Sequence, residues 1–214
     1  MGFFDRQVAA PDVEPEPFRP PRPAWMKPED VIPGVVAENH LLVHTDRAAV
    51  AISGLLAYPT GLEFSVTAVL RTPDHRADLS HHHRIGYWAG TPLPAEFLRV
   101  GVLFADGSSV TNMDRHAFTP LDTEPPGPLL FPGSAESDAR RHVAHYWVWP
   151  LPPAGPVAFV CEWPAYDIPE SRVQVNAQVI LDAAARAVRL WPDTDETTNN
   201  PHPNLSTPPD HLRG

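Results

Sequence analysis

The sequence has few cysteines, no long apolar run and no secretory leader, and each of these absences excludes a class of protein. Its 214 residues contain one cysteine, Cys161, which excludes a disulfide within the chain. No run of 18 apolar residues occurs, so no segment matches the length of a membrane-spanning helix. The first residues lack the basic start and the apolar stretch of a secretory leader. These absences predict a cytoplasmic protein that does not insert into a membrane.

Positive charge is also scarce. The chain has 16 basic and 26 acidic residues and a net charge of −10, and Lys27 is the one lysine. Binding of a nucleic acid backbone needs a cluster of basic side chains, whereas these arginines are scattered along the sequence. The charge pattern therefore predicts that nucleic acid is not a partner.

Sequence motifs of catalysis are absent as well. The chain contains no G-x-S-x-G, no P-loop and no G-x-G-x-x-G fingerprint. The sequence predicts no cofactor and favours a protein that is not an enzyme.

Proline is abundant, with 28 residues, and it separates the ends from the middle. Eight prolines fall within residues 1–33 and five within residues 192–214. We therefore predict an extended, proline-rich arm over residues 1–30, a domain over 31–191 and a flexible tail over 192–214. Phe18, Trp25 and Met26 are the anchors expected to hold the arm on its own domain or on a neighbouring subunit.

Residues 31–191 carry the signals of strands. In segment 62–71 apolar and polar side chains alternate, which indicates a strand with one packed face. Ala105-Asp106-Gly107 is a hairpin signal, and Tyr58-Pro59-Thr60-Gly61 is a turn signal. The prolines and glycines of 119–140 predict a long surface loop. Strands are expected at 35–44, 47–58, 62–71, 85–89, 97–104, 108–113, 142–149, 157–163 and 172–175.

A single helix is predicted from residue 177 to about 190. Asn176 is the candidate N-cap, and apolar residues then recur at helical spacing. The fold class that follows is mainly β, an antiparallel β-sandwich with one C-terminal helix. Both an immunoglobulin-like and a jelly-roll strand order fit the pattern.

Four segments together resemble uncharacterised β-rich proteins common in high-GC bacteria. They are Tyr58-Pro59-Thr60-Gly61, Tyr146-Trp147-Val148-Trp149-Pro150-Leu151-Pro152, Phe159-Val160-Cys161-Glu162-Trp163-Pro164 and Leu190-Trp191-Pro192. The resemblance covers roughly residues 30–192 and implies no activity, cofactor or catalytic residue.

Histidines supply one candidate site. His75, His81 and His83 lie within ten residues, and neutral imidazoles suit Zn²⁺ or Ni²⁺. Adjacent side chains of an extended segment diverge, however, and paired zinc-ligand spacings are absent. A metal site and a solvated loop are the two interpretations.

Tryptophans supply the other candidate. Trp147 and Trp149 share one face of a predicted strand, and Trp163 lies on the next strand. Aromatic rows stack on sugars or dock proline-rich partners, but the interpretation that we prefer is a central strand covered on both faces, by a second sheet and by the helix. Cys161 alternates with Phe159 and Trp163, which predicts a packed thiol rather than a nucleophile.

Three functions remain open at this stage. The first is a protein-interaction or assembly component that engages a protein partner or forms a homo-oligomer. The second is a module that binds a small ligand or a carbohydrate through Trp147, Trp149 and Trp163. The third is a metal-dependent enzyme that uses His75, His81 and His83.

Overall fold

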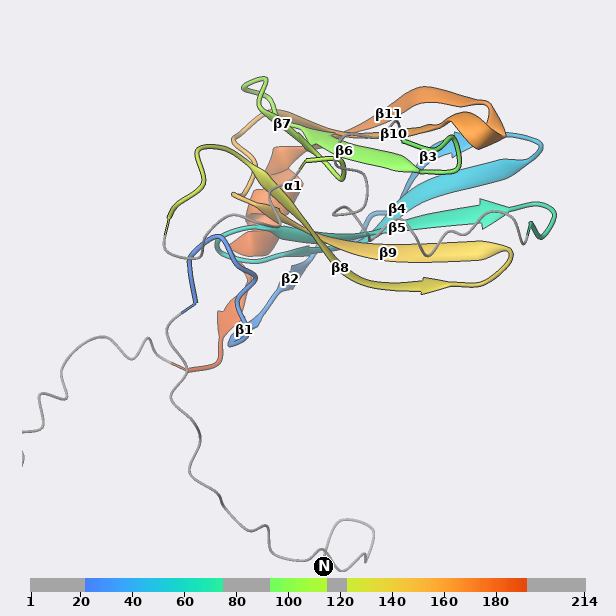
Figure 1. The fold of residues 1–214 in the computed structure, drawn as a ribbon. Coiled ribbons are helices and arrows are strands. Elements are labelled where there is room, and N and C mark those ends of the chain that lie inside the picture. Colours follow the sequence, from blue (N-terminus) through green and yellow to red (C-terminus); the bar gives the residue numbers. More distant parts are fainter. Residues whose placement is uncertain (1–21, 75–92, 115–122, 192–214) are drawn as a thin grey trace, which may run out of the picture.

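A computed structural model of the chain describes residues 22–74, 93–114 and 123–191. Within these ranges the chain is mainly β, all strand pairs are antiparallel, and the α-helical part is one short helix. No helix in the described ranges combines the length and the apolar character needed to cross a membrane. The predicted fold class is confirmed in this form, as a sandwich-like stack of two sheets (Figure 1).

The larger sheet has six strands. Its central pair is β5 and β9, and β8 forms one edge. At the other side β2 and β3 both pair with β4. The strands are β2 (Gly34–Val35), β3 (His40–His44), β4 (Ala48–Ala57), β5 (Leu62–Leu70), β8 (Leu129–Ser137) and β9 (Arg141–Trp149).

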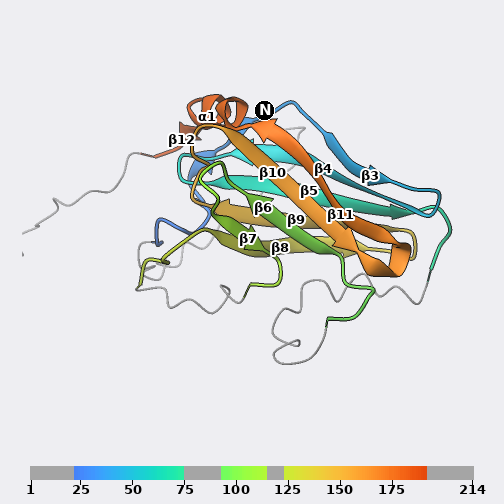
Figure 2. The ribbon, with the colours of Figure 1, turned by 90° about the horizontal axis from the view of Figure 1, so that it is seen from above.

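The smaller sheet has four strands in the order β11-β10-β6-β7. Seen from above, it lies across the larger sheet, with β3 beside β11 (Figure 2). A 3-10 turn (Pro164–Tyr166) joins β10 to β11. The strands are β6 (Arg99–Leu103), β7 (Ser109–Thr111), β10 (Pro156–Trp163) and β11 (Ile168–Asn176).

The core lies between the two sheets and follows from the alternation of side chains. Phe64 of β5 and Phe159 of β10 meet edge to face, with ring centroids 5.0 Å apart. Along β9 the inward residues Ala144, Tyr146 and Val148 are buried in the same core. Apolar residues at every second position thus place one face of each sheet against the other.

The helix α1 (Ala177–Ala184) begins where the sequence predicts it. The Asn176 side chain accepts a hydrogen bond from the Gln178 amide at 2.9 Å, so Asn176 is the N-cap. The helix is shorter than predicted, because the chain after it forms strand β12 (Val188–Arg189) with β1 (Val31–Ile32). Pairing with a distant segment replaces the helical turn that the local spacing favours.

The prediction of a loop over 119–140 is wrong for residues 129–137, because these residues form strand β8. Pro132 and Gly133 were the signals for a loop. Both are accommodated at the sheet edge, where the register of β8 against β9 shifts between Pro132 and Ala135. Edge strands and bulges tolerate proline, which lacks an amide donor.

Two other boundaries differ. The predicted strand 35–44 is divided into β2 and β3, and the predicted strand 172–175 is the middle of the longer β11. The strand predicted at 85–89 and the tail 192–214 lie outside the described residues.

Candidate functional site

The outer face of β9 carries an aromatic group that we call the aromatic face, composed of Tyr58, Trp147 and Trp149. Trp147 and Trp149 share one face of β9, as the alternation predicts, and this face is the one opposite to the core between the sheets. The Tyr58 ring meets Trp147 edge to face at 5.4 Å. Such contacts between aromatic edges and faces stabilise a packed cluster.

The chain's own N-terminal segment covers this face. The Trp147 indole Nε1–H donates to the Trp25 carbonyl at 2.8 Å, and the Trp25 ring stands edge-on to Trp149 at 6.5 Å. Trp25 is thereby buried. Residues of the predicted arm therefore pack on the described chain itself, and they cover the face that the sequence interpretation assigned to the helix.

Lys27, close to Trp25 in the N-terminal segment, interacts with Glu63 and Tyr58 of the domain. The Lys27 ammonium lies 2.9 Å from Glu63 Oε1 and 5.9 Å from the centroid of the Tyr58 ring. The Tyr58 hydroxyl donates to Glu63 Oε2 at 3.2 Å. Burial raises the pKa of Tyr58 to about 12, and the Glu63 carboxylate adds to the rise. Tyr58 therefore stays protonated and serves as a donor.

Trp163 lies elsewhere. It is fully buried in the core between the sheets, where its indole N–H donates to the Glu96 carbonyl at 2.8 Å. Its ring packs on Tyr166 at 4.2 Å. The structure therefore brings Trp147 and Trp149 together and does not bring Trp163 to their surface.

The remaining predicted site residues are placed as follows. Met26 is partly exposed, and its amide closes a turn with the Pro23 carbonyl at 3.0 Å. Phe18, His75, His81 and His83 lie outside the described residues, so the metal site stays a prediction. Within the ranges that the structure describes, no group of three or more His, Cys, Asp or Glu side chains could hold a metal ion.

Cys161 packs in the core, as its alternation predicts. The side chain is buried beside the inner faces of β6 and β10, and burial raises the pKa of its thiol to about 12. A neutral thiol without solvent access is a poor nucleophile.

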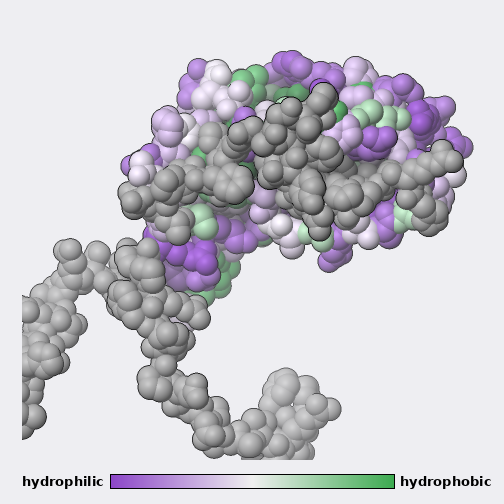
Figure 3. Space-filling model, viewed as in Figure 1, coloured by the Kyte–Doolittle hydropathy of each residue, from purple (hydrophilic) through white to green (hydrophobic). Residues whose placement is uncertain are grey.

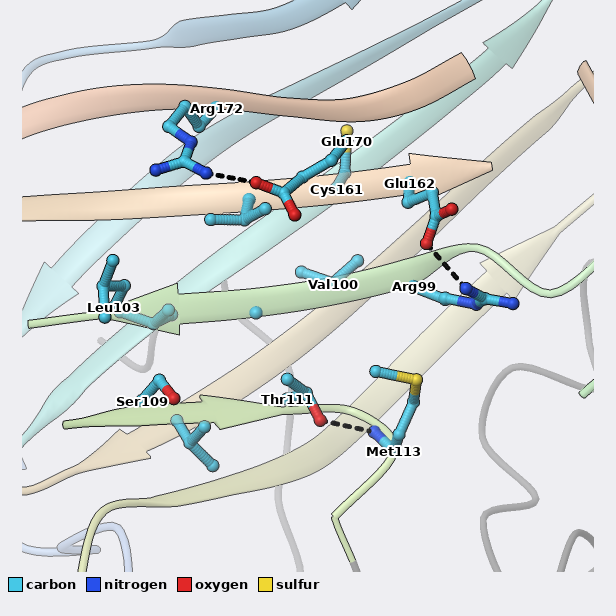
Figure 4. A pocket seen from close by; sticks show the side chains of 14 residues that line it. Arg99, Val100, Leu103, Ser109, Thr111, Met113, Cys161, Glu162, Glu170 and Arg172 are labelled. Atoms are coloured by element: carbon cyan, nitrogen blue, oxygen red, sulfur yellow. Dashed lines mark hydrogen bonds and ion pairs between the residues drawn. The ribbon is translucent and has the colours of Figure 1, made fainter. Parts of the chain in front are cut away.

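A hollow on the outer face of the four-stranded sheet was missed by the sequence interpretation (Figure 4). It has a volume of about 330 Å³. Gly101 is one of its lining residues, paired with Val160 on one side and with Thr111 on the other. A Cβ at Gly101 would lie 3.1 Å from the Val110 carbonyl oxygen and 3.2 Å from Thr111 Cγ2, so this outward position of β6 carries no side chain.

Ion pairs border this hollow. Arg99 donates to Glu162 Oε2 at 2.6 Å, and Arg172 pairs with Glu170 on β11. Met113, which is exposed, lies on the same side of the hollow as Arg99 (Figure 4). The hollow thus combines apolar lining residues with two separate ion pairs on its border (Figure 4), and apolar surface with a few polar groups is typical of small-ligand sites. The signal in the sequence was a glycine at an outward position of a strand.

The second surface missed from the sequence is the ribbon formed by β1 and β12, which projects from one end of the sandwich (Figure 1). Seven large apolar side chains are exposed in the described part of the chain. Five of these seven lie on this ribbon, directly after it or on the neighbouring strand β2, and we call them the ribbon surface: Ile32, Val35, Val188, Leu190 and Trp191. In Figure 3 hydrophobic surface appears beside strongly hydrophilic surface in the region of the ribbon, at the lower edge of the coloured part of the molecule.

Comparisons of this chain with known protein families, with curated proteins and with solved structures found no match. The resemblance to β-rich proteins of high-GC bacteria stays a prediction.

Proposed function

We propose that the protein is an interaction component of a protein assembly and that it binds its partner through the ribbon surface. The observation that carries this proposal is the concentration of exposed apolar side chains. Ile32 is 53% exposed, Val188 55% and Trp191 65%. Most of the exposed apolar side chains of the described chain are therefore gathered at one end of the molecule.

Contiguous apolar surface is a common mark of a protein interface. Scattered exposed hydrophobic residues need no such explanation, and Leu41 on β3, which is 61% exposed, is one of these. The ribbon is different because two strands alone make a marginal structure in water. A partner that covers the outer face would stabilise it by removing apolar area from water, at roughly 25 cal/mol per Å² before the cost of association.

The proposal changes the role of the N-terminal anchors. Trp25 already packs on Trp147 and Trp149 of its own chain, so it holds the segment in place. Deletion of residues 1–30 would expose the aromatic face, so it would change the stability of the domain and its binding to a partner at the same time. Substitutions on the ribbon surface separate the two, because these side chains have few contacts to lose.

The test is a triple variant, Ile32→Thr/Val188→Thr/Leu190→Thr, in the full chain. Threonine keeps a β-branched side chain on both strands of the ribbon. Leu41→Thr is the matched control, since it also removes an exposed leucine. Each protein is purified under mild conditions from the cells that naturally produce it, and the mass of the complex is measured by native mass spectrometry. The proposal includes a cytoplasmic location of the protein.

We expect the natural chain and Leu41→Thr to carry the same bound protein, another copy included, and the triple variant to lose it. A triple variant that retains the same complex would contradict the proposal. A natural chain that carries no partner of any kind would contradict it as well.

The hollow around Gly101 supports a second candidate, the binding of a small ligand with an apolar body and a group that hydrogen-bonds to Arg99 or Arg172. Val160→Phe would fill the hollow from β10, where Val160 faces outward beside Gly101. Thermal-shift screening of small carboxylates should then give stabilisation of the natural chain and none of Val160→Phe. Equal responses of the two proteins, or none, would dismiss this candidate.

A further inference from the structure

We propose that the aromatic face is a docking site for a short segment of a partner protein, and that the chain's own residues 22–30, which we call the strap, occupy it as an intramolecular ligand. The segment that the face recognises has a proline that begins a turn, a tryptophan two residues later and a basic side chain two residues after the tryptophan. The proposal goes beyond the ribbon surface and does not depend on it, because it concerns a different surface of the chain.

The strap contacts the face through three kinds of group that lie within three consecutive residues. The Trp25 carbonyl accepts a hydrogen bond from the Trp147 indole at 2.8 Å, and the Trp25 ring stands edge-on to Trp149 at 6.5 Å. Two residues later, the Lys27 ammonium lies 2.9 Å from Glu63 Oε1. A buried aromatic anchor beside a few directed polar contacts is how protein interfaces concentrate their binding energy. The contact therefore has the composition of a peptide bound to its receptor.

The strap is given its shape by its own bonds. The Met26 amide donates to the Pro23 carbonyl at 3.0 Å, which closes a β-turn with Trp25 as its third residue. Arg22 forms an ion pair with Glu29 of the strap itself. A segment that holds its bound shape by itself loses less conformational entropy on binding. A short peptide can therefore present the same groups to the face.

The strap is not a strand of either sheet. In the described chain, the main-chain groups of residues 22–29 form no hydrogen bond with the main chain of the sheets. The pairing begins only at Asp30, whose carbonyl accepts from the Leu190 amide at 2.7 Å. Release of the strap therefore leaves every strand pair intact. Segments held by few contacts of this kind open locally at a low cost compared with global unfolding.

The strap of a second copy is the competing occupant of the face. Trp25 is six residues from Val31, so it reaches at most about 20 Å from that residue, and Val31 is buried against Tyr58 and Trp147 of its own chain. An exchange of straps would therefore press together two domains that each carry a net charge of −10. A basic segment on another protein has no such limit of reach, and it is attracted by Glu63 and by the net charge of the chain.

The tether gives the strap an advantage over any free segment. A ligand on a short tether has an effective concentration in the millimolar range, so a free peptide should bind the natural chain weakly. Loss of the strap contacts removes this competitor and should strengthen the binding of the same peptide. A strap that serves only to pack the domain predicts no binding of added peptide to the natural chain or to any variant.

The first experiment measures binding of a fluorescent peptide of residues 20–30 to full-length proteins by fluorescence anisotropy. Trp25→Ala should bind this peptide at least tenfold more tightly than the natural chain does. Met26→Ala is the matched control, because it alters a partly exposed neighbour, and it should resemble the natural chain. The same peptide with alanine in place of Trp25 should not bind.

The second experiment opens the strap without truncating a buried side chain. Lys27→Glu places a like charge beside Glu63, and the Lys27 side chain is 43% exposed, so this variant carries the test if Trp25→Ala does not fold. Lys27→Glu should bind the natural peptide severalfold more tightly than the natural chain does. Lys27→Glu/Glu63→Lys restores the ion pair with its charges exchanged, so it should bind the peptide no better than the natural chain.

A redesigned peptide separates recognition from reassembly of the chain's own fragment. It keeps Arg22 and Glu29, which brace the strap, and the groups of Pro23, Trp25 and Lys27, and it has serine at the other positions. Trp25→Ala should bind it within severalfold of the natural peptide. Its failure to bind would contradict the recognition of these groups alone.

The partner is then sought in the cells that naturally produce the protein. Proteins that co-purify with Lys27→Glu more than with Lys27→Glu/Glu63→Lys are identified by mass spectrometry. At least one should contain a proline, a tryptophan and a basic residue at the spacing of the strap, and a synthetic peptide of that segment should displace it. The absence of such a protein would overturn the docking of a partner.

The peptide experiments use purified protein, so their result is independent of whether the ribbon surface has a partner. Peptide binding to Trp25→Ala and to Lys27→Glu that is no tighter than binding to the natural chain would overturn the proposal. A natural chain that forms a dimer which the peptide dissociates would assign the face to the strap of a second copy and would overturn it too.

Discussion

The indole N–H of Trp147 donates to the backbone carbonyl of Trp25 across a distance of 2.8 Å and a separation of 122 residues. This bond joins the N-terminal segment to the outer face of a central strand. Because the acceptor is a backbone oxygen, the Trp25 side chain can be removed without removing the bond. The contribution of the Trp25 ring to stability can therefore be measured separately.

Trp25→Ala should lower the free energy of unfolding by about 2–4 kcal/mol, since truncation of a buried tryptophan leaves a cavity. The cavity would lie where the Trp25 ring packs against Trp149. Urea denaturation followed by circular dichroism gives the value. Met26→Ala, at a partly exposed neighbour, should cost much less, and a similar loss in both variants would show that the Trp25 ring is not the anchor.

Gly34→Ala should be among the most damaging single substitutions in the described chain. A Cβ at Gly34 would lie 1.7 Å from the carbonyl oxygen of Ala183, a backbone atom of α1 that cannot rotate away. We expect a loss of at least about 2–3 kcal/mol or a failure to fold. Gly127→Ala is the control, because a Cβ there meets nothing within 4 Å. Thermal unfolding of the two variants should differ clearly, and equal melting temperatures would contradict the packing of β2 on α1.

Asn176→Ala should destabilise the protein by about 1 kcal/mol, because the Gln178 amide would lose its side-chain acceptor at the start of α1. Asn176→Ser should restore most of this loss, since a serine hydroxyl also caps a helix. Urea denaturation of both variants is the measurement. If serine is as damaging as alanine, the hydrogen bond from the Gln178 amide to the residue 176 side chain is not what stabilises the start of α1.

Stability should fall as the pH rises above 9. The pKa of the Cys161 thiol is raised from 9.0 to about 12 by burial, so the folded state keeps its proton while the unfolded state releases it. The stabilisation is fully present below pH 9 and is lost as the pH rises toward 12. Between pH 9 and 10 the thiol should account for a loss of roughly 1 kcal/mol.

Cys161→Val isolates this contribution. The variant should show a shallower decline of unfolding free energy between pH 9 and 10 than the natural chain, measured by urea denaturation at each pH. Tyr146, whose pKa is raised from 10.0 to about 12 by burial, adds to the decline at higher pH in both proteins. Parallel curves between pH 9 and 10 would show that the thiol ionises equally in both states.

Local pattern was sufficient for much of the sheet structure. The alternation in β5, β9 and β10 predicted which side chains share a face, because the period of a strand is two residues, but it did not predict which face of β9 enters the core. It also predicted that Cys161 is packed and that Trp147 and Trp149 share a face. The N-cap at Asn176 was predictable for the same reason, since capping depends on neighbouring residues alone.

The sequence by itself therefore determined the fold class, the inward faces of the main strands and the start of α1, all of which depend on contacts within a few residues. Only the tertiary structure decided that residues 129–137 form β8, that residues 188–189 leave the helix to pair with β1, and that Trp25 covers Trp147 while Trp163 enters the core. Each of these outcomes depends on a partner far away in the chain. The ribbon surface and the hollow at Gly101 arise in the same way, from side chains that distant pairing leaves exposed or from a side chain that is missing in the middle of a sheet.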